Sequence, residues 1–335
     1  MFSTHPCKAE EDKDAPELTV KASRAIDKGL QYLLENQRED GSWGGNDEGA
    51  RSTAITSLVL MAFMSRAEFP GSGPNGEALT RAKDWLLKQA AASPNGYLGS
   101  TMYEHGIATL SLSELWGMTG NKEDDAVIEK ALKDAVDVIV RSQSPAGGWR
   151  YQPTPSAGED TSVTGTVFVG LASARQAGIP IPNETIEKTL LYLESAANKK
   201  SGGFVYRPTG AGQQAGVSLG STAAAAYVAQ LLGKRDTEMV EDAISYLEAR
   251  APGIFQGTGY YYYHHYYSIQ CMVQAGDDHY AKWYPQIRDA LISKQLGDGS
   301  WGGGKKEGTK TVGHTTPMAI IILATPHRYI PIYQR

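Results

Sequence analysis

Residues 28–43 read Lys-Gly-Leu-Gln-Tyr-Leu-Leu-Glu-Asn-Gln-Arg-Glu-Asp-Gly-Ser-Trp, and this stretch decides the fold. Its closing pattern of glutamine, glycine and tryptophan occurs three times in the chain: Gln37/Gly41/Trp43, Gln143/Gly147/Trp149 and Gln295/Gly299/Trp301. Other glycine–aromatic pairs extend the series to six aromatic positions, which are 41 to 56 residues apart: 43, 97, 149, 204, 260 and 301. A fixed period of this length indicates an array of helical repeats.

Each repeat contains two helical patterns of different character. The segment before the turn is amphipathic, since Ile26, Leu30 and Leu33 share one face of a helix whose other face is charged. The segment after the turn is rich in small residues and nearly free of charge, as in 161–174 and 218–229. Helices of that composition are crowded by neighbours on every side. The sequence therefore predicts an all-α protein with six outer and six inner helices.

Twelve alternating helices form either an open solenoid or a closed ring. Six pairs is the number that closes in the known toroids, so we expect an (α/α)6 toroid, with the open solenoid as the alternative. The toroid should span residues 19–335 as one domain, preceded by a polar segment at 1–18. In a ring all six turns lead to the N-termini of inner helices, which must then lie on one rim.

The composition excludes several classes of protein. The net charge is −5 and the basic residues are scattered, which argues against a nucleic-acid partner. Cys7 and Cys271 form neither a zinc motif nor a disulfide framework. Residues 1–18 lack the apolar stretch of a signal peptide. The longest aliphatic run, 318–324, is far shorter than the ~20 residues of a membrane span. We expect no transmembrane segment; peripheral membrane contact and the cellular compartment stay open.

The pattern K-G-x-x-Y-L-x-x-x-Q-x-x-x-G-x-W of residues 28–43 resembles the QW motif of squalene and oxidosqualene cyclases, and 291–301 resembles a degenerate copy. Over about residues 19–325 the chain is similar to the terpenoid cyclase and protein prenyltransferase superfamily, which implies a toroid with a central cavity. Residues 328–335 are similar to the end of uncharacterised bacterial proteins with such repeats. The motif predicts braces, in which glutamine hydrogen-bonds free backbone groups and tryptophan packs over them.

Squalene-type cyclases carry an Asp-x-Asp-Asp motif at the third turn, and its central acid protonates the substrate. The matching stretch here is 157–160, Ala-Gly-Glu-Asp. The resemblance therefore gives Glu159 the role of the acid, with Asp160 and, at the second turn, Glu104 as further catalytic candidates. An acid that protonates an alkene must be held protonated by burial and by its neighbours. In the alternative interpretation, Asp160 caps the helix that starts at Thr161.

Aromatic and basic residues at the predicted rim are candidates for ligand binding. Residues 260–267 hold six of the 18 tyrosines. Their faces could stabilise carbocations in a cyclase, stack on sugar rings, or fill the space between helices. The candidate ligand-binding residues are Arg51, Tyr103, His105, Arg150, Tyr262, Tyr263, His264, His265, Tyr266, Tyr267 and His314. Further cations at the rim are Arg207, Lys305, Lys306 and Lys310.

Protein prenyltransferases bind zinc through Asp and Cys in the fifth unit and His in the sixth. The matching positions hold His264, Tyr266 and His314, so the thiolate is missing and peptide prenylation is not expected. We expect no metal or other cofactor. In the lesser alternative, zinc would be bound by His314 with one of His264 and His265, which point about 100° apart on a helix.

Three functions remain open for such a toroid. The leading hypothesis is an isoprenoid-handling protein with a cyclase-like activity on a hydrophobic substrate, which a deep, aromatic-lined apolar pocket would favour. A non-catalytic toroid that binds a hydrophobic ligand or a protein is the second, and a filled centre would favour it. The third is a carbohydrate-active enzyme, with an open groove between two carboxylates.

Overall fold

The computed structural model describes residues 16–44, 51–208, 216–251, 255, 260–302 and 312–334. This part of the chain contains twelve α-helices and no β-strand, only two isolated bridges. The outer helices are α1 (Val20–Glu35), α3 (Gly76–Ala92), α5 (Lys122–Ser142), α7 (Asn183–Ala196), α9 (Glu238–Glu248) and α12 (Asp277–Lys294). The inner helices are α2 (Thr53–Met64), α4 (Met102–Leu115), α6 (Thr161–Gln176), α8 (Leu219–Leu231), α11 (Tyr261–Ala275) and α13 (Val312–Ala324). Two 3-10 helices follow α13, namely η1 (Thr325–His327) and η2 (Pro331–Tyr333).

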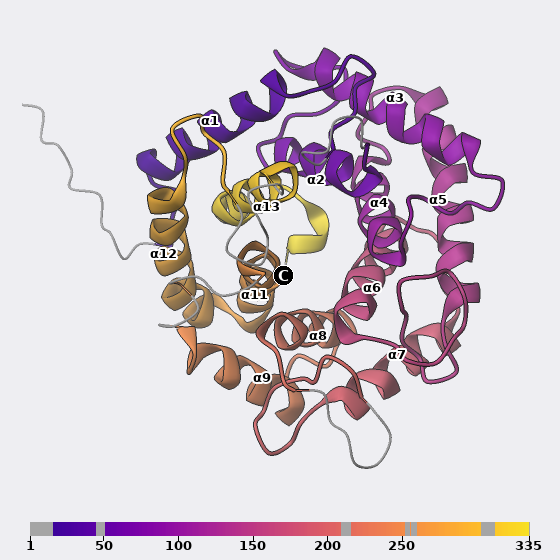
Figure 1. Ribbon diagram of the computed structural model, residues 1–335, viewed down its shortest axis with the longest axis vertical. Coiled ribbons are helices and arrows are strands. Elements are labelled where there is room, and N and C mark those ends of the chain that lie inside the picture. Colours follow the sequence, from indigo (N-terminus) through magenta and orange to yellow (C-terminus); the bar gives the residue numbers. More distant parts are fainter. Residues whose placement is uncertain are drawn as a thin grey trace, which may run out of the picture.

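The inner helices form a closed ring that the outer helices surround (Figure 1). Each inner helix contacts the next, in the order α2, α4, α6, α8, α11 and α13, and α13 contacts α2 again. In the outer layer α1 packs against α12, so the first and last repeats meet. The predicted (α/α)6 toroid is confirmed, and the open solenoid is wrong. The space that the six inner helices enclose is called the lumen below.

Burial separates the two rings as the sequence predicted. Every residue of α2 is buried, whereas α1 buries one face and exposes the other. Glycines allow the inner helices to approach closely. A Cβ on Gly106 would lie 2.9 Å from the Cα of Val167, and a Cβ on Gly170 would lie 2.4 Å from the carbonyl oxygen of Gly106. Because both distances are below van der Waals contact, larger residues would force α4 and α6 apart.

The repeat glutamines clamp each turn to the following outer helix. Each side-chain amide donates to the glycine carbonyl of its own turn and to a carbonyl of the next outer helix. These second bonds join Gln37 to Ala78, Gln143 to Thr185 and Gln295 to Ala25 at 2.7–3.0 Å. The tryptophan indole N–H donates backward, as Trp43 does to the carbonyl of Leu33 at 2.7 Å. The predicted bracing role is confirmed, and the bond from Gln295 to Ala25 closes the ring.

The glycines of this pattern are required by close backbone contacts. Gly41, Gly147 and Gly299 have φ of 88°, 93° and 91°, a region that favours glycine. A Cβ on any of them would lie 2.0–2.5 Å from a main-chain oxygen of the next outer helix. A Cβ on Gly29 would lie 2.6 Å from the ring of Trp301. The turn of the last repeat therefore packs against Lys28 and Gly29, at the start of the motif.

The fifth turn differs from the tryptophan turns. Tyr260, the aromatic position of the fifth unit, is 62% exposed and directly precedes α11 with φ of 60°. Phe255 is the aromatic residue that packs inward here, stacked on His265 at 5.2 Å and edge-on to Trp283 at 5.2 Å. The run of tyrosines hid this earlier phenylalanine, since all of its members fit the aromatic position equally well.

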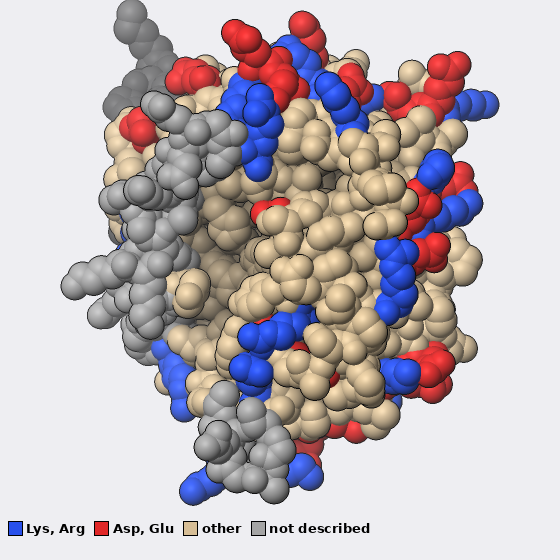
Figure 2. Space-filling view, turned by 45° about the vertical axis from the view of Figure 1, so that its right-hand side comes forward, with Lys and Arg blue, Asp and Glu red and all other residues tan. Residues whose placement is uncertain are grey.

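Charged side chains lie mainly along the outer surface, whereas a hollow in the same face is lined mostly by uncharged residues (Figure 2). None of the helices within the described ranges combines the length and the apolar character that crossing a membrane requires. The predicted polar segment 1–18 is described only from residue 16, and α1 begins at Val20.

Candidate functional site

The N-terminal ends of the inner helices form one end of the lumen, called the mouth below. Side chains of Ser52, Thr101, Asp160 and Ser218 cap α2, α4, α6 and α8 by accepting backbone N–H bonds. Consecutive turns are joined by backbone bonds, from Met102 to Tyr151 at 2.8 Å and from Thr161 to Tyr206 at 2.9 Å. The mouth is therefore a row of capped helix N-termini, as ring geometry requires.

Aromatic side chains from non-adjacent helices meet across the lumen just below the mouth. The rings of Tyr103 on α4 and Tyr263 on α11 lie 6.1 Å apart. Tyr103 also lies 6.4 Å from His314 on α13, and Tyr263 lies 5.0 Å from Tyr267. Because α4 and α11 are three positions apart in the ring, these contacts span the lumen. We call Tyr103, Tyr263, Tyr267 and His314 the aromatic floor.

Hydroxyl groups fix the aromatic floor to α6. The Tyr267 hydroxyl lies 2.7 Å from the hydroxyl of Thr166, and the Tyr263 hydroxyl donates to the carbonyl of Ser162 at 3.3 Å. Burial raises the pKa of both phenols well above the ordinary value. These side chains are therefore neutral, hydrogen-bonded walls rather than proton carriers at physiological pH.

The three candidate acids are bound to backbone N–H groups at the mouth. Glu104 accepts from Ser100 at 2.9 Å, and buried Glu159 accepts from Gly158 at 3.0 Å. Asp160 accepts from Val163 at 2.8 Å and so caps α6. The geometry suits capping more than proton donation.

Among the basic candidates, Arg51 forms an ion pair with Asp40 at the first turn. Arg150 donates to the carbonyl of Gly158 at 2.5 Å. Arg207 lies close by, since a Cβ on Gly158 would be 2.8 Å from its Nη2. Arg150 and Arg207 thus form a basic pair beside Glu159 at the third turn. Lys305, Lys306 and Lys310 lie outside the described residues.

Three candidate histidines lie in the wall between the two rings. His105 accepts from the backbone N–H of Leu98 at 3.0 Å, and its Nε2 lies 3.0 Å from the carbonyl of Ala135 on α5. His265 packs on Phe255 and, at 4.5 Å, on Tyr261. His264 lies 4.3 Å from His265. Burial lowers the pKa of His105 and of His264 to about 4, so both are neutral at pH 7.

The remaining candidates differ in their position. Tyr262 is buried and meets Tyr261 edge-on at 5.1 Å. His314 is partly buried beside Tyr103, and desolvation lowers its pKa to about 4. Among the residues that the structure describes, no group of three or more His, Cys, Asp or Glu could hold a metal ion. Within that part of the chain the donor set does not fit zinc.

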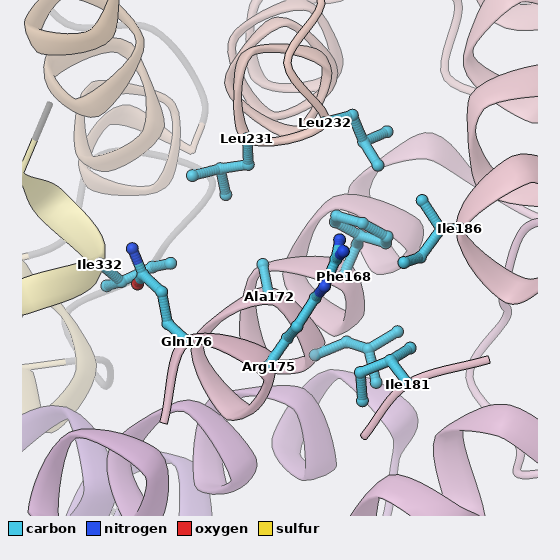
Figure 3. A pocket seen from close by; sticks show the side chains of 10 residues that line it. Phe168, Ala172, Arg175, Gln176, Ile181, Ile186, Leu231, Leu232 and Ile332 are labelled. Atoms are coloured by element: carbon cyan, nitrogen blue, oxygen red, sulfur yellow. The ribbon is translucent and has the colours of Figure 1, made fainter. Parts of the chain in front are cut away.

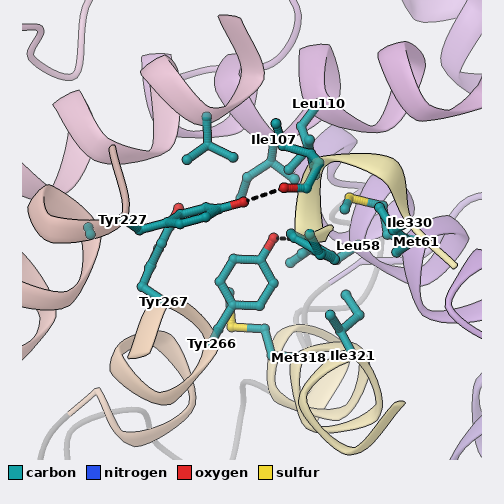
Figure 4. Packing of buried hydrophobic residues seen from close by; sticks show 14 of the residues in the cluster. Leu58, Met61, Ile107, Leu110, Tyr227, Tyr266, Tyr267, Met318, Ile321 and Ile330 are labelled. Carbon is teal, nitrogen blue, oxygen red and sulfur yellow. Dashed lines mark hydrogen bonds between the residues drawn. The ribbon is translucent and has the colours of Figure 1, made fainter. Parts of the chain in front are cut away.

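The last described residues lie inside the ring of inner helices (Figure 1). Ile332 lies beside Gln176 and Leu232, at the C-terminal ends of α6 and α8, so this segment occupies the end of the lumen opposite the mouth. Ile330, Ile332 and Tyr333 are at most 5% exposed. The hydroxyl of Tyr227 donates to the carbonyl of Ile332 at 2.8 Å, and the hydroxyls of Tyr266 and Tyr333 form a short hydrogen bond. Side chains from α2, α4, α8, α11 and α13 surround this segment (Figure 4). Residues 330–334 are called the C-terminal plug below.

Glu114 is a candidate that sequence reasoning missed. It is buried in the last turn of α4, accepts from the hydroxyl of Ser173 at 2.6 Å and accepts from the backbone N–H of Ile332. Burial raises its pKa to about 7. In the sequence, Glu114 could have been found as the single carboxylate that directly follows the uncharged segment 106–113 of a predicted inner helix.

A pocket of about 320 Å³ opens beside the plug, between the C-terminal ends of α6 and α8 (Figure 3). Its lining is mainly aliphatic, with Phe168, Ile181, Leu231 and Ile332 among the residues, and Arg175 adds a cation. The plug thus forms part of the wall of this pocket.

Comparisons with known proteins show the fold. No family model matches the chain. Over 102 residues the chain is 26% identical to alpha-onocerin synthase LCD of Lycopodium clavatum. The matched stretch is 30% of this chain and 13% of that protein. The chain therefore spans only a small part of the length of this relative.

Solved structures match over nearly the whole chain. The α-1,6-mannanase GH76A of Salegentibacter sp. HEL1_6 has a TM-score of 0.66 at 11% identity and covers 92% of this chain and 99% of its own. Type II terpene cyclase MstE of Scytonema has a TM-score of 0.62 at 17% identity, with coverages of 93% and 100%. The chain is thus an (α/α)6 toroid with the fold of the terpenoid-cyclase-like proteins, as its sequence predicted.

Proposed function

We propose that the chain binds a hydrophobic small molecule of the isoprenoid class in its lumen. The observation that carries this proposal is the inner surface, where aromatic and aliphatic side chains from different helices face one another: Leu58, Met61, Tyr103, Ile107, Tyr227, Tyr263, Tyr266, Tyr267, Met318 and Ile321. Structures of MstE variants in complex with geranylgeranyl dihydroxybenzoate support a ligand of this class.

The geometry supports binding more than cyclisation. The aromatic floor and the plug fill the centre, and a filled centre favours a binding protein. Glu159 accepts the backbone N–H bond of Gly158 and Asp160 that of Val163, so both carboxyl groups are engaged in the third turn and in the cap of α6. If a cyclase-like reaction takes place, Glu159 is the acid we propose, with Glu104 and Asp160 as supporting carboxylates.

The binding proposal is tested with geranylgeraniol and the full chain. Tyr103→Ala removes one side of the aromatic floor and should weaken binding at least tenfold in a calorimetric or fluorescence titration. Tyr329→Ala is the matched control, because Tyr329 is 47% exposed and lies away from the floor. Equal affinities of Tyr103→Ala and the wild type would show that the mouth is not part of the binding site.

Catalysis is tested separately by incubating linear isoprenoids with the wild type and with Glu159→Gln, followed by product analysis. Products from the wild type that disappear in the variant would establish a cyclase with Glu159 as its acid. Products from both proteins would exclude Glu159 as the acid. Their absence from both would leave a binding protein.

A carbohydrate ligand is the second candidate. Glu159 and Asp160 are adjacent carboxylates at the mouth, and the hydroxyls of Tyr151 and Tyr206 lie 3.2 Å apart nearby. The mannanase variant that is described as inactive has two adjacent aspartates replaced by asparagine. Titration with α-1,6-mannotriose decides between the two classes, because we expect no heat from this sugar where geranylgeraniol binds.

A further inference from the structure

The C-terminal plug is not needed to close the toroid. The inner ring is complete without it, since α13 contacts both α11 and α2. The plug follows α13 through η1 and through Arg328, a residue with φ of 51°. It then turns back into the lumen, where Ile332 and Tyr333 are buried. A segment that fills an already closed ring has the position of a ligand.

The contacts of the plug are also those of a bound ligand. Polar side chains of α4, α8 and α11 hold its main chain. The carbonyl of Ile332 accepts from Tyr227 at 2.8 Å, and its N–H is held by Glu114. At the far end, the side chain of Gln274 donates to the carbonyl of Gln334 at 2.6 Å. Apolar side chains of the neighbouring helices α2 and α13 also line this part of the lumen, namely Leu58, Met61 and Ile321 (Figure 4).

The donor and the acceptor that contact Ile332 define the functional group that a ligand needs in order to replace the plug. Tyr227 offers a hydroxyl donor and Glu114 offers an acceptor, and both address the same residue. A single alcohol group accepts one hydrogen bond and donates another, so it can satisfy both partners at once. The lumen around it is aliphatic and aromatic. A linear chain with one terminal hydroxyl meets both requirements.

Gln270 adds an independent indication that this part of the lumen accommodates polar groups. It is 1% exposed, and neither atom of its side-chain amide has a partner among the described residues. Gln270 lies one helical turn before Gln274 and after Tyr267, two residues that reach toward the centre. Because i, i+3 and i+4 positions share a helix face, its amide lies on the lumen side of α11.

We propose that the plug-filled half of the lumen is a binding site for a linear isoprenoid alcohol, which the chain's own residues 330–334 occupy until such a ligand displaces them. This inference rests on the proposed function, because it names the ligand class and adds an internal competitor. The plug withdraws as a unit, and the alcohol takes the place of the Ile332 main chain, whose carbonyl bonds Tyr227 and whose N–H bonds Glu114.

The test uses the full chain with Ile332→Asp, which places a charge in the apolar lumen and should expel the plug. Hydrogen–deuterium exchange of residues 330–334 should become at least tenfold faster. Affinity for farnesol should rise at least tenfold, and affinity for farnesene, the same hydrocarbon skeleton without a hydroxyl, should rise less. Tyr329→Ala should change neither quantity more than twofold. A synthetic peptide of residues 328–335 should compete with farnesol for Ile332→Asp.

Two results would overturn the proposal: slow exchange of the plug in Ile332→Asp, or equal farnesol affinity of the variant and the wild type. In the second case the wild-type affinity for farnesol would leave the proposed function intact. Faster exchange with no binding of farnesol or farnesene would instead refute the isoprenoid ligand while the plug still withdraws. If Ile332→Asp does not fold, Gln274→Ala provides the same test, since it removes the bond to the carbonyl of Gln334 and leaves Tyr227 and Glu114 in place. Exchange of residues 330–334 should then become about threefold to tenfold faster, and the affinity for farnesol should rise.

Discussion

The two ends of the lumen are built from the same six helices but differ in chemistry. At the mouth, unpaired N–H groups of helix N-termini bind carboxylates and hydroxyls, as Asp160 and Thr101 show. At the plug end, carbonyls and neutral side chains prevail, and burial raises the pKa of Glu114 to about 7. The polarity of parallel helices therefore places the capping carboxylates and hydroxyls at the mouth, where the unpaired N–H groups lie.

The largest effect should come from a change at the point where the ring closes. Trp301 is fully buried, and its indole N–H donates to the carbonyl of Leu291 at 2.8 Å where the last repeat meets the first. We expect Trp301→Ala to lower the free energy of unfolding by about 3–5 kcal/mol. Thermal unfolding followed by circular dichroism measures this loss. Leu296→Ala, at a residue that is 50% exposed in the same turn, should change little.

Acid should destabilise the mouth side of the molecule. Burial lowers the pKa of His264 to about 4, against about 6.5 in an unfolded chain. Between pH 4 and pH 6.5 the folded state thus binds fewer protons at His264 than the unfolded state does. The contribution of the neutral His264 to the free energy of unfolding is therefore complete above pH 6.5 and is lost as the pH falls toward 4. His264→Gln should reduce this loss by roughly 2–3 kcal/mol at pH 4. Urea unfolding at pH 4 to 8 checks it, with His279→Gln, a change on the surface of α12, as the control.

Alkali should destabilise the plug end. Burial raises the pKa of Glu114 to about 7, above its value in the unfolded chain. Between about pH 4.5 and 7 the folded state holds a proton on Glu114 that the unfolded state has lost. The contribution of the protonated Glu114 to the free energy of unfolding is therefore complete below this window and is lost as the pH rises through it. Glu114→Gln should stabilise the protein by about 1–3 kcal/mol at pH 8 and change little at pH 4.5. A slope of stability against pH that Glu114→Gln leaves unchanged would contradict this assignment. Glu104→Gln at the mouth is the control.

The sequence by itself determined the architecture. Repeated glutamine, glycine and tryptophan positions predicted six helix pairs, because each of these residues serves a local contact that recurs in every unit where it appears. Periodicity also separated outer from inner helices, since one-sided and all-round burial need different compositions. At the third turn the sequence left two roles for Asp160, and the capping bond to Val163 supports the structural one.

Only the tertiary structure determines which side chains line the lumen. Consecutive residues such as His264, His265, Tyr266 and Tyr267 differ in direction by about 100° each, and packing determines which of them faces a wall and which faces the centre. His265 therefore meets Phe255, whereas Tyr266 meets Tyr333 from the far end of the chain. The pairing of Glu114 with Ile332 joins α4 to the last residues of the chain. No local pattern encodes such a contact, because it arises from the path of the chain through the closed ring.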